Sequence, residues 1–579
     1  MYFTGWRDYL FEAFNSIIGT EIRDKKSCLD IKEFDTQKLS RFHIVVGKYG
    51  GKLSALSRNY QFQNSFKLYF SHDEPLDDLS STEALKQMFD PKVTGIIERT
   101  ENLTLDLSGS SCLRNIVPHL GGNGFIYLKR LDLNKGQYEC LIDSTTNPIA
   151  RHAFENLVSM KLRDLKLNKI WYGFLPPWCF SQLQEVELNY VSALEFLWKG
   201  PIEPPSFCNL RSIEVRNCAQ ITTLFSQSTL KCLVKLQKLV AYDCKNLESI
   251  VLREENLKEE VLELPQLKVL RLMWTNLMGF GSKDSKAGVF FDQVSLPCLE
   301  ILEINSPGDG PELLIGGKMA SRSLGNLKSM HLYHGDFIRC IAKADTVSLL
   351  QNLQTLERWW GNMEFLIDFE DLKVPNMPKM GLEILPKLES LDLFACTRLT
   401  HIWRNFPEGV RVFQNLRSLC VYNCPLNCLF YPPSVATMLI SLEKLKVRRC
   451  SKMCGVIGEE DEEVSQEDNA QQHDAGKHGE IALERISKEF VFPKLNSLWL
   501  EDLKNLRNFG GSHREDYEFK FPLLTKLFIM SCPKLKKLCF GNLDAPLLKK
   551  IQTKSRDIEN FEAPVDLKDR EICPDDGVV

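Results

Sequence analysis

The feature that most constrains the fold is a short motif, Leu-x-x-Leu-x-Leu-x-x-Cys, which returns many times along the 579 residues. The clearest copies, with Ile or Val at some leucine positions, span residues 210–218, 388–396, 442–450 and 524–532. Apolar and polar residues alternate within each copy, which predicts a short strand with one buried face. Because one such strand cannot bury its own apolar face, neighbouring copies must stack and share a core.

Looser copies occupy most of the remaining chain. They begin at Thr100, Leu128, Leu157, Leu183, Leu236, Leu267, Leu299, Leu327, Leu353, Leu416 and Leu495, and two weaker ones begin at Leu39 and Gln63. This makes about seventeen repeats, most of them roughly 26 to 32 residues apart, which predicts a leucine-rich-repeat solenoid of the α/β class. We expect a horseshoe with a parallel concave sheet and an irregular or short-helical convex side, forming one elongated domain over residues 1–552.

Two segments depart from the repeat. Between 458 and 488 the period breaks, and residues 459–468 hold seven acidic side chains and no basic one. Such a composition predicts a solvated, disordered insertion within the array. Residues 553–579 are polar, which predicts a C-terminal tail beyond the last repeat.

The composition argues against two classes of partner. The formal net charge is -4, which does not favour nucleic acid. No apolar run approaches the roughly 18 residues of a membrane span. The first residues also lack the basic, apolar, small-residue order of a signal peptide. We therefore expect a cytoplasmic protein without a membrane span.

Six of the nineteen cysteines occupy the same place just after the predicted strand: Cys218, Cys244, Cys396, Cys424, Cys450 and Cys532. A small, weakly polar side chain at this turn suits a structural role, with the thiol meeting backbone groups of the adjacent repeat. Cys420, Cys424, Cys428, Cys450 and Cys454 fall in two adjacent repeats, but a zinc site needs four convergent ligands. Their three-residue spacing is poor for that purpose, so we expect no metal.

Catalytic signatures are missing from the sequence. Residues 44–53 contain Gly and Lys, but with the wrong spacing for a phosphate loop and without its Ser or Thr. We find no nucleophile elbow, His-Glu-x-x-His, kinase signature or dinucleotide fingerprint. The sequence therefore predicts a binding protein that is not an enzyme and needs no cofactor.

Solenoids present their concave sheet to partners, so the outward residues of the predicted strands are the candidate site. Aromatic side chains collect there near the middle of the chain, and a basic group follows. The predicted partner-binding residues are Tyr242, Trp274, Tyr333, Trp359, Trp360, Phe394, Tyr422, Lys446 and Arg448. Exposed Trp and Tyr favour a binding hot spot, whereas simple stacking between neighbouring strands would give the same pattern. The sequence leaves both interpretations open.

Several longer sequence segments are more specific to one protein family than the repeat motif is. They occupy residues 99–105 (RTENLTL), 207–218 (FCNLRSIEVRNC), 385–391 (LPKLESL) and 492–500 (FPKLNSLWL), and the paired repeats at Leu416 and Leu442 precede an acidic insertion. In these features the chain resembles the leucine-rich-repeat region of plant coiled-coil nucleotide-binding leucine-rich-repeat (NBS-LRR) disease resistance proteins. The resemblance covers nearly the whole chain.

The resemblance implies a recognition module of an intracellular immune receptor. Its protein partner would be a pathogen effector, a host target altered by one, or the nucleotide-binding domain of the same receptor. Because no phosphate loop, coiled-coil heptad or switch domain is recognisable, nucleotide chemistry is not carried over. Met1 falls inside the array without a recognisable capping repeat, so we expect a truncated gene product or a fragment of a longer receptor.

Two other classes remain as alternatives. One is a substrate adaptor of the F-box leucine-rich-repeat class, or a free-standing interaction scaffold, although no F-box-like helical segment precedes the repeats. The other is a secreted repeat receptor or inhibitor, which the missing signal peptide and the unpaired pattern of cysteines oppose.

Overall fold

Two compact units make up the chain, where the sequence predicts a single array. Unit 1 comprises residues 1–286, 291–299 and 304–308, and unit 2 comprises 287–290, 300–303 and 309–579. The computed structural model describes residues 42–47, 62–69, 91–107, 115–117, 120, 122–145, 152–198, 202–252, 262–277, 291, 294–306, 313–315, 323–336, 338–343, 346–370, 383–458, 488–510, 517–539, 541–548, 550–553 and 571–574.

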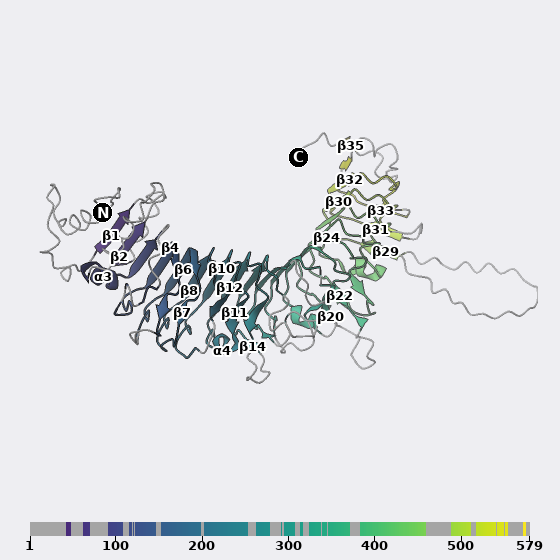
Figure 1. Ribbon diagram of the computed structural model, residues 1–579. Helices are drawn as coiled ribbons and strands as arrows, with labels where there is room; N and C mark the ends of the chain where they lie inside the picture. Colours follow the sequence, from purple (N-terminus) through teal and green to yellow (C-terminus); the bar gives the residue numbers. More distant parts are fainter. Residues whose placement is uncertain are drawn as a thin grey trace, which may run out of the picture. The chain divides into compact units, whose positions relative to one another are not determined.

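A parallel main sheet runs through unit 1, with one strand from each repeat (Figure 1). Its strands are β1 (Phe42–Gly47), β2 (Asn64–Tyr69), β3 (Asn102–Asp106), β4 (Arg130–Tyr138), β6 (Ser159–Leu167), β8 (Glu185–Asn189), β10 (Ser212–Arg216), β12 (Lys238–Tyr242) and β15 (Val269–Met273). Each strand pairs in parallel with the next. The residues of β17 (Ile301–Ser306) are divided between the two units.

Unit 2 has the same construction. Its main strands are β19 (Ser329–His334), β21 (Thr355–Gly361), β24 (Ser390–Cys396), β27 (Ser418–Tyr422), β28 (Lys444–Arg448), β30 (Ser497–Glu501), β32 (Lys526–Met530), β34 (Lys550–Thr553) and β35 (Glu571–Pro574). These also pair in parallel and in sequence order. The prediction of a parallel leucine-rich-repeat sheet is therefore confirmed, and each of the seventeen predicted repeats contains a main strand.

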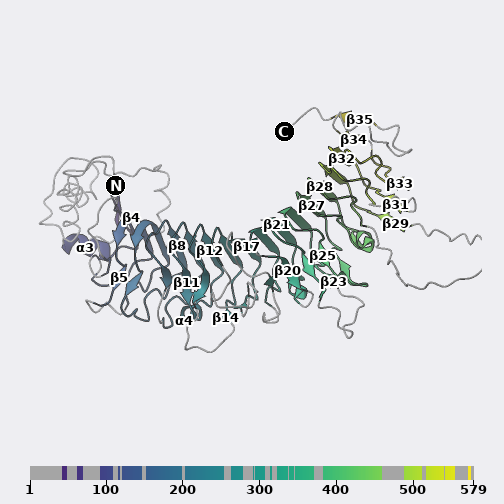
Figure 2. The ribbon, with the colours of Figure 1, turned by 45° about the vertical axis from the view of Figure 1, so that its right-hand side comes forward.

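The far side of each unit carries short parallel strands more than helices. In unit 1 these outer strands are β5 (Ile142–Asp143), β7 (Trp171–Tyr172), β9 (Phe196–Trp198), β11 (Thr223–Ser226), β13 (Ser249–Leu252), β14 (Leu262–Glu263) and β16 (Val294–Ser295), with helices α3 (Pro91–Glu98) and α4 (Gln227–Leu230). Figure 2 shows β5 and β11 on the side of unit 1 opposite to β8 and β12.

Unit 2 follows the same plan on its far side. Its outer strands are β18 (Leu313–Ile315), β20 (Cys340–Lys343), β22 (Ile367–Asp368), β23 (Glu383–Ile384), β25 (Trp403–Arg404), β26 (Arg411–Val412), β29 (Lys488–Val491), β31 (Tyr517–Lys520) and β33 (Leu543–Asp544), with 3-10 turns η5 (Val347–Leu350) and η7 (Pro433–Met438). The convex side was predicted to be irregular or short-helical, and these short strand ladders are the main difference in the described residues.

Alternation along the main strands places the core between the main and outer strands. In β10, for example, Ile213 and Val215 are fully buried while Ser212, Glu214 and Arg216 are partly exposed. Burying such apolar rows contributes about 25 cal/mol for each Å² removed from water. Since each row is completed only by the next strand, stability depends on the stacking of neighbours.

A row of phenylalanine rings reinforces the core of unit 1. Phe125, Phe154, Phe180 and Phe207 each precede the first leucine of a repeat by three residues, and all four are fully buried. Successive ring centroids lie 5.5, 5.5 and 5.3 Å apart in stacked arrangements. All four residues have positive φ, between 53° and 60°. This phenylalanine spine was not predicted, although its Phe-x-x-Leu spacing is visible in the sequence.

The recurrent cysteines are buried and have the structural role that we expected. Cys244 and Cys424 each direct their Sγ toward a carbonyl oxygen of the preceding main strand, at 3.7 Å from Val215 O and Leu393 O respectively. Burial raises the pKa of the Cys244 thiol to about 11, so it stays protonated and can donate. All sixteen cysteines between Cys140 and Cys539 are free of a disulfide.

The structure describes the two segments that depart from the repeat to different extents. Residues 459–487 of the predicted acidic insertion lie outside the described residues, but the strands on either side remain in register, with Lys444 opposite Ser497. In the predicted C-terminal tail, β35 pairs in parallel with β34 and extends the main sheet. The other residues of the tail lie outside the described part.

Candidate partner-binding face

Four aromatic side chains form a continuous column on the outward face of the main sheet in unit 2. Tyr333, Trp359, Phe394 and Tyr422 lie directly opposite one another on four consecutive strands, β19, β21, β24 and β27. Successive ring centroids are 6.4, 4.0 and 6.0 Å apart, and the Trp359 and Phe394 rings stack at an interplanar angle of 19°. We call these four residues the aromatic column. The in-register parallel strands create it, because they bring the same repeat position together at every step.

Trp360 lies beside the aromatic column, two residues after the second leucine position of the strand, which Arg358 occupies. Its side chain is 49% exposed, and its ring stacks on that of His334, with centroids 5.2 Å apart. Both residues have positive φ, as do Asn217, Asp243, Ala395, Asn423, Arg449, Asp502 and Ser531 at the same repeat position. The turn after most main strands therefore has a residue in the left-handed conformation. Asn and Asp adopt this conformation readily, whereas a Trp there is strained.

Arg358 anchors the turn that carries Trp360. It stands at the third leucine position of the motif, the second within the strand, and points into the core, where its side chain is fully buried. The guanidinium donates hydrogen bonds to the carbonyl oxygens of His334 and, at 2.9 Å, of Gly335, so it ties two successive turns together. Burial lowers the pKa of Arg358. Gly361 provides the space, since a Cβ there would lie 1.9 Å from Nη2 of Arg358.

Mostly polar and charged residues occupy a second outward column, two residues nearer the strand start. His331, Glu357, Asp392, Cys420 and Lys446 lie in register on successive strands. Nδ1 of His331 is 3.0 Å from Oε2 of Glu357. Two carboxylates on adjacent strands disfavour each other. The pKa of Asp392 is accordingly raised to about 6, mainly by burial and next by Glu357.

The raised pKa of Asp392 predicts a pH-dependent stability. A carboxyl whose pKa is higher in the folded than in the unfolded chain stabilises the fold at low pH, and this contribution is lost as the pH rises through about 6. Relative to the wild type, Asp392→Asn should therefore gain stability above pH 6, by about 1 kcal/mol after allowance for solvent screening. Urea unfolding of both proteins at about pH 4 and about pH 8 measures this. An equal difference at both pH values would contradict the assignment.

The positive charges of the predicted basic group are only partly available to a partner. Nε of Arg448 lies 2.6 Å from Oε2 of Glu501, and this hydrogen bond raises the pKa of Arg448. Arg449 donates to the hydroxyl of Tyr422 at 2.6 Å. Lys446 is exposed, with its ammonium 6.0 Å from the centre of the Trp499 ring. Of Lys446, Arg448 and Arg449, Lys446 is therefore the residue whose positive charge is most available to a partner.

Tyr242 and Trp274 belong to unit 1 and are treated separately from the aromatic column. They are 39% and 42% exposed. Arg216 lies over the Tyr242 ring, with its Cζ 6.0 Å from the ring centroid. Trp274 has φ of 57°, the same strained turn conformation as Trp360. The remaining predicted residues of the site, from Tyr333 to Arg448, are all in unit 2.

The sequence analysis missed one stacked pair. Trp499 and Phe528 face each other on β30 and β32, with ring centroids 4.2 Å apart and an interplanar angle of 18°. They occupy the position between the two strand leucines, whereas the predicted column follows the second leucine. Reading both outward positions of each repeat would have found them.

The described residues carry neither a metal site nor a membrane-spanning helix. Nowhere in the described ranges do three or more His, Cys, Asp or Glu side chains converge in a way that could hold a metal ion. Among the helices of the described residues, none has the length and apolar character needed to cross a membrane.

The stacked repeats, each with one strand in the parallel main sheet, define a leucine-rich-repeat protein, and comparison with known families refines this class. Residues 176–245 and 313–451 match the family described as plant disease resistance protein RPS2-like, leucine-rich repeats. A putative disease resistance protein of Arabidopsis thaliana is 23% identical over 61% of the chain, and a probable one of the same plant is 24% identical over 49%. The chain is thus related to the leucine-rich-repeat region of plant disease resistance proteins.

The matches cover only part of these relatives. The aligned regions span 38% and 28% of the two Arabidopsis proteins. Among solved structures, a leucine-rich-repeat protein of Leptospira interrogans is 16% identical, with a TM-score of 0.29, over 85% of this chain and 100% of that one.

Proposed function

We propose that this chain is the recognition module of a plant intracellular immune receptor and acts by binding protein rather than by catalysis. Its partner is a pathogen effector or a host protein modified by one, and binding takes place in the cytoplasm. The relationship to plant disease resistance proteins supports the defence role. The outward face of the main sheet in unit 2, with the aromatic column and Trp360, is the proposed binding surface.

The observation that carries this proposal is the 49% exposed side chain of Trp360 beside the stacked rings of the aromatic column. Its positive φ is shared by the residue at the same position of other repeats, among them Tyr190, Asn217 and Arg449, so the fold does not require a Trp there. A half-exposed Trp beside stacked aromatic rings offers a large contact area with little loss of conformational entropy on binding.

The charged residues of this face indicate which charges a complementary partner would carry. Glu357 and Asp392 lie beside the Trp359 and Phe394 part of the aromatic column, and Lys446 lies on β28 beyond Tyr422. A partner that places a basic side chain near the carboxylates and an acidic one near Lys446 would be complementary. Such complementarity contributes more to specificity and association rate than to affinity.

Replacing Trp360 by Asn separates stability from binding. Asn tolerates the positive φ, so we expect the free energy of unfolding to stay the same or to rise by up to about 1 kcal/mol. The affinity for the protein partner should fall by roughly tenfold or more, since a half-exposed Trp in an interface is a frequent hot spot. Thermal unfolding and titration with the purified partner measure the two effects. A clear loss of stability with unchanged affinity would show instead that Trp360 serves the fold.

A further inference from the structure

Two cysteine thiols of unit 1 are in contact on the turns of successive repeats. Cys208 lies in the turn before β10, and Cys232 lies in the turn that follows α4. Their thiols are hydrogen-bonded to each other. Both residues are outside the helices and strands, so their side chains can approach more closely without a change in the main sheet. A disulfide needs such an approach, because its two sulfur atoms are only about 2.05 Å apart.

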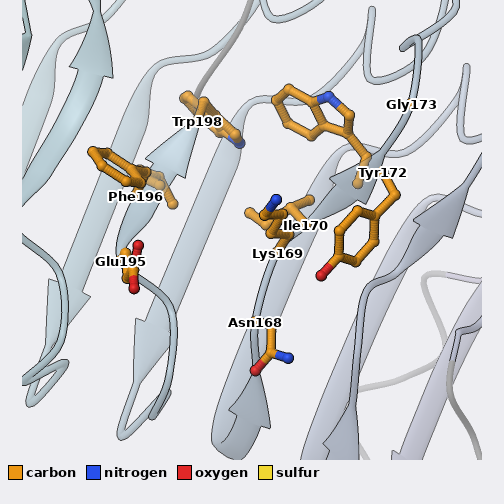
Figure 3. A pocket seen from close by; sticks show the side chains of 10 residues that line it. Asn168, Lys169, Ile170, Tyr172, Gly173, Glu195, Phe196 and Trp198 are labelled. Carbon is orange, nitrogen blue, oxygen red and sulfur yellow. The ribbon is translucent and has the colours of Figure 1, made fainter.

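Contacts around the thiols hold these two turns together. Lys235 donates from its Nζ to Oδ1 of Asn209 at 2.7 Å, which joins the same two turns. Phe207, directly before Cys208, is buried, and its ring lies 4.3 Å from that of Trp198, one of the side chains at the pocket in Figure 3. The fold thus keeps the two thiols together, which favours a reaction between them over a reaction with a second molecule.

The two thiols differ in their access to solvent. Cys208 is partly exposed, whereas Cys232 is only 4% exposed. The thiols of Cys396 and Cys424 in unit 2 are also hydrogen-bonded to each other, but these residues are 0% and 1% exposed. A dissolved reagent can therefore reach Cys208, while the pair in unit 2 is closed to it.

The surroundings of each thiol indicate the order in which the two react. Burial raises the pKa of the Cys208 thiol, and the Lys235 ammonium and the Cys232 thiol offset part of this rise. Burial and then the Cys208 thiol raise the pKa of Cys232 to about 11. The thiolate is the reactive form, so the reaction of Cys208 should become faster as the pH rises above neutral. Cys208, partly exposed and beside a lysine, is the residue that attacks first.

We propose that Cys208 and Cys232 form a reversible disulfide by exchange with a low-molecular-weight disulfide. The Cys208 thiolate attacks one sulfur of the small disulfide, releases the other half as a thiolate and leaves a mixed disulfide. The Cys232 thiolate then attacks the Cys208 sulfur, forms the bond between the two residues and releases the second small thiolate. Two protein thiols are oxidised, one small disulfide is reduced to two thiols, and the two protein protons pass to the released thiolates.

The disulfide joins two successive repeats outside the main sheet. It constrains the unfolded chain and so stabilises unit 1 against unfolding, until a reductant breaks it. This modification site is in unit 1 and is independent of the proposed protein-binding face.

Oxidation of the full chain by oxidised glutathione tests the proposal. The reduced protein, freed of reductant, is incubated with oxidised glutathione at about pH 8, quenched with acid and alkylated, and its peptides are analysed by mass spectrometry. We expect a peptide pair linked through Cys208 and Cys232, which dithiothreitol separates, and free thiols at Cys396 and Cys424. A stable glutathione adduct on Cys208 without the link would overturn the proposal, and so would an unreacted Cys208.

Three variants separate the two steps. Cys232→Ser removes the second thiol, so the glutathione adduct should accumulate on Cys208. Cys208→Ser removes the partly exposed thiol, and Cys232 should then stay unmodified. Cys298→Ser is the matched control, because Cys298 is another partly exposed cysteine of unit 1, and this variant should form the link as the wild type does. Rapid addition of glutathione to Cys232 in Cys208→Ser would contradict the assigned order of attack.

Discussion

Phe180→Ala is expected to lower the free energy of unfolding of unit 1 by about 3–5 kcal/mol. The Phe180 ring stacks on Phe154 at 5.5 Å and on Phe207 at 5.3 Å, so its loss leaves a cavity in the middle of the phenylalanine spine. Ala gains nothing from the positive φ of 59°, because it also disfavours that conformation. Since each repeat is stabilised by its neighbours, we expect the effect to spread to β6, β8 and β10.

Native-state hydrogen exchange resolves this effect strand by strand. The amides of β6, β8 and β10 should lose protection in Phe180→Ala, while those of β32 in unit 2 should not. Phe174→Ala is the matched control, because Phe174 is 62% exposed and should contribute less than about 0.5 kcal/mol. Equal destabilisation by the two variants would mean that the spine is not an important part of the core.

Trp359→Ala is expected to reduce affinity for the protein partner by about 30-fold or more, as for a central hot-spot residue. Trp359 is in the middle of the aromatic column, where it contacts both Tyr333 and Phe394. Removing its ring deprives the partner of contact area and also leaves the two neighbouring rings without support. Isothermal titration with the purified partner measures the loss.

Trp499→Ala separates binding from stability in this experiment. Trp499 stacks on Phe528 at 4.2 Å, much as Trp359 stacks on Phe394 at 4.0 Å, so both substitutions remove an equivalent intramolecular contact. We expect similar losses of stability, and a larger loss of affinity for Trp359→Ala. Trp359→Phe should retain most of the affinity. If all three variants bind like the wild type, the aromatic column only covers the sheet.

The repeat motif predicted the main sheet well because its physical cause is local. The alternation in a segment such as 210–218 determines which residues face inward, and the cysteine that follows marks the turn. Stacking then places the same repeat position side by side, so the order of the aromatic column could be read from the spacing alone. The weak copies at Leu39 and Gln63 also contain strands, β1 and β2.

Other features depend on contacts that a single repeat does not reveal. Arg358 departs from the leucine pattern, and the sequence does not explain why. The structure does, because the Arg358 guanidinium donates hydrogen bonds to the carbonyl oxygens of His334 and Gly335. The positive φ at Trp360 follows from a turn geometry shared by most of the described repeats, which spacing does not specify. The outer strands of two to four residues are too short to give an alternating pattern. The role of the predicted site in binding stays a prediction.

The most direct test of the proposed binding face compares the protein interactions of two triple variants in plant tissue. Trp359→Ala/Trp360→Ala/Tyr422→Ala removes the centre of the face in unit 2. Tyr127→Ala/Phe174→Ala/Trp178→Ala removes three exposed aromatic residues outside the main sheet of unit 1. With both variants shown to be folded by circular dichroism, quantitative co-purification should lose specific protein partners only in the first. Retention of every partner by the first variant would contradict the account.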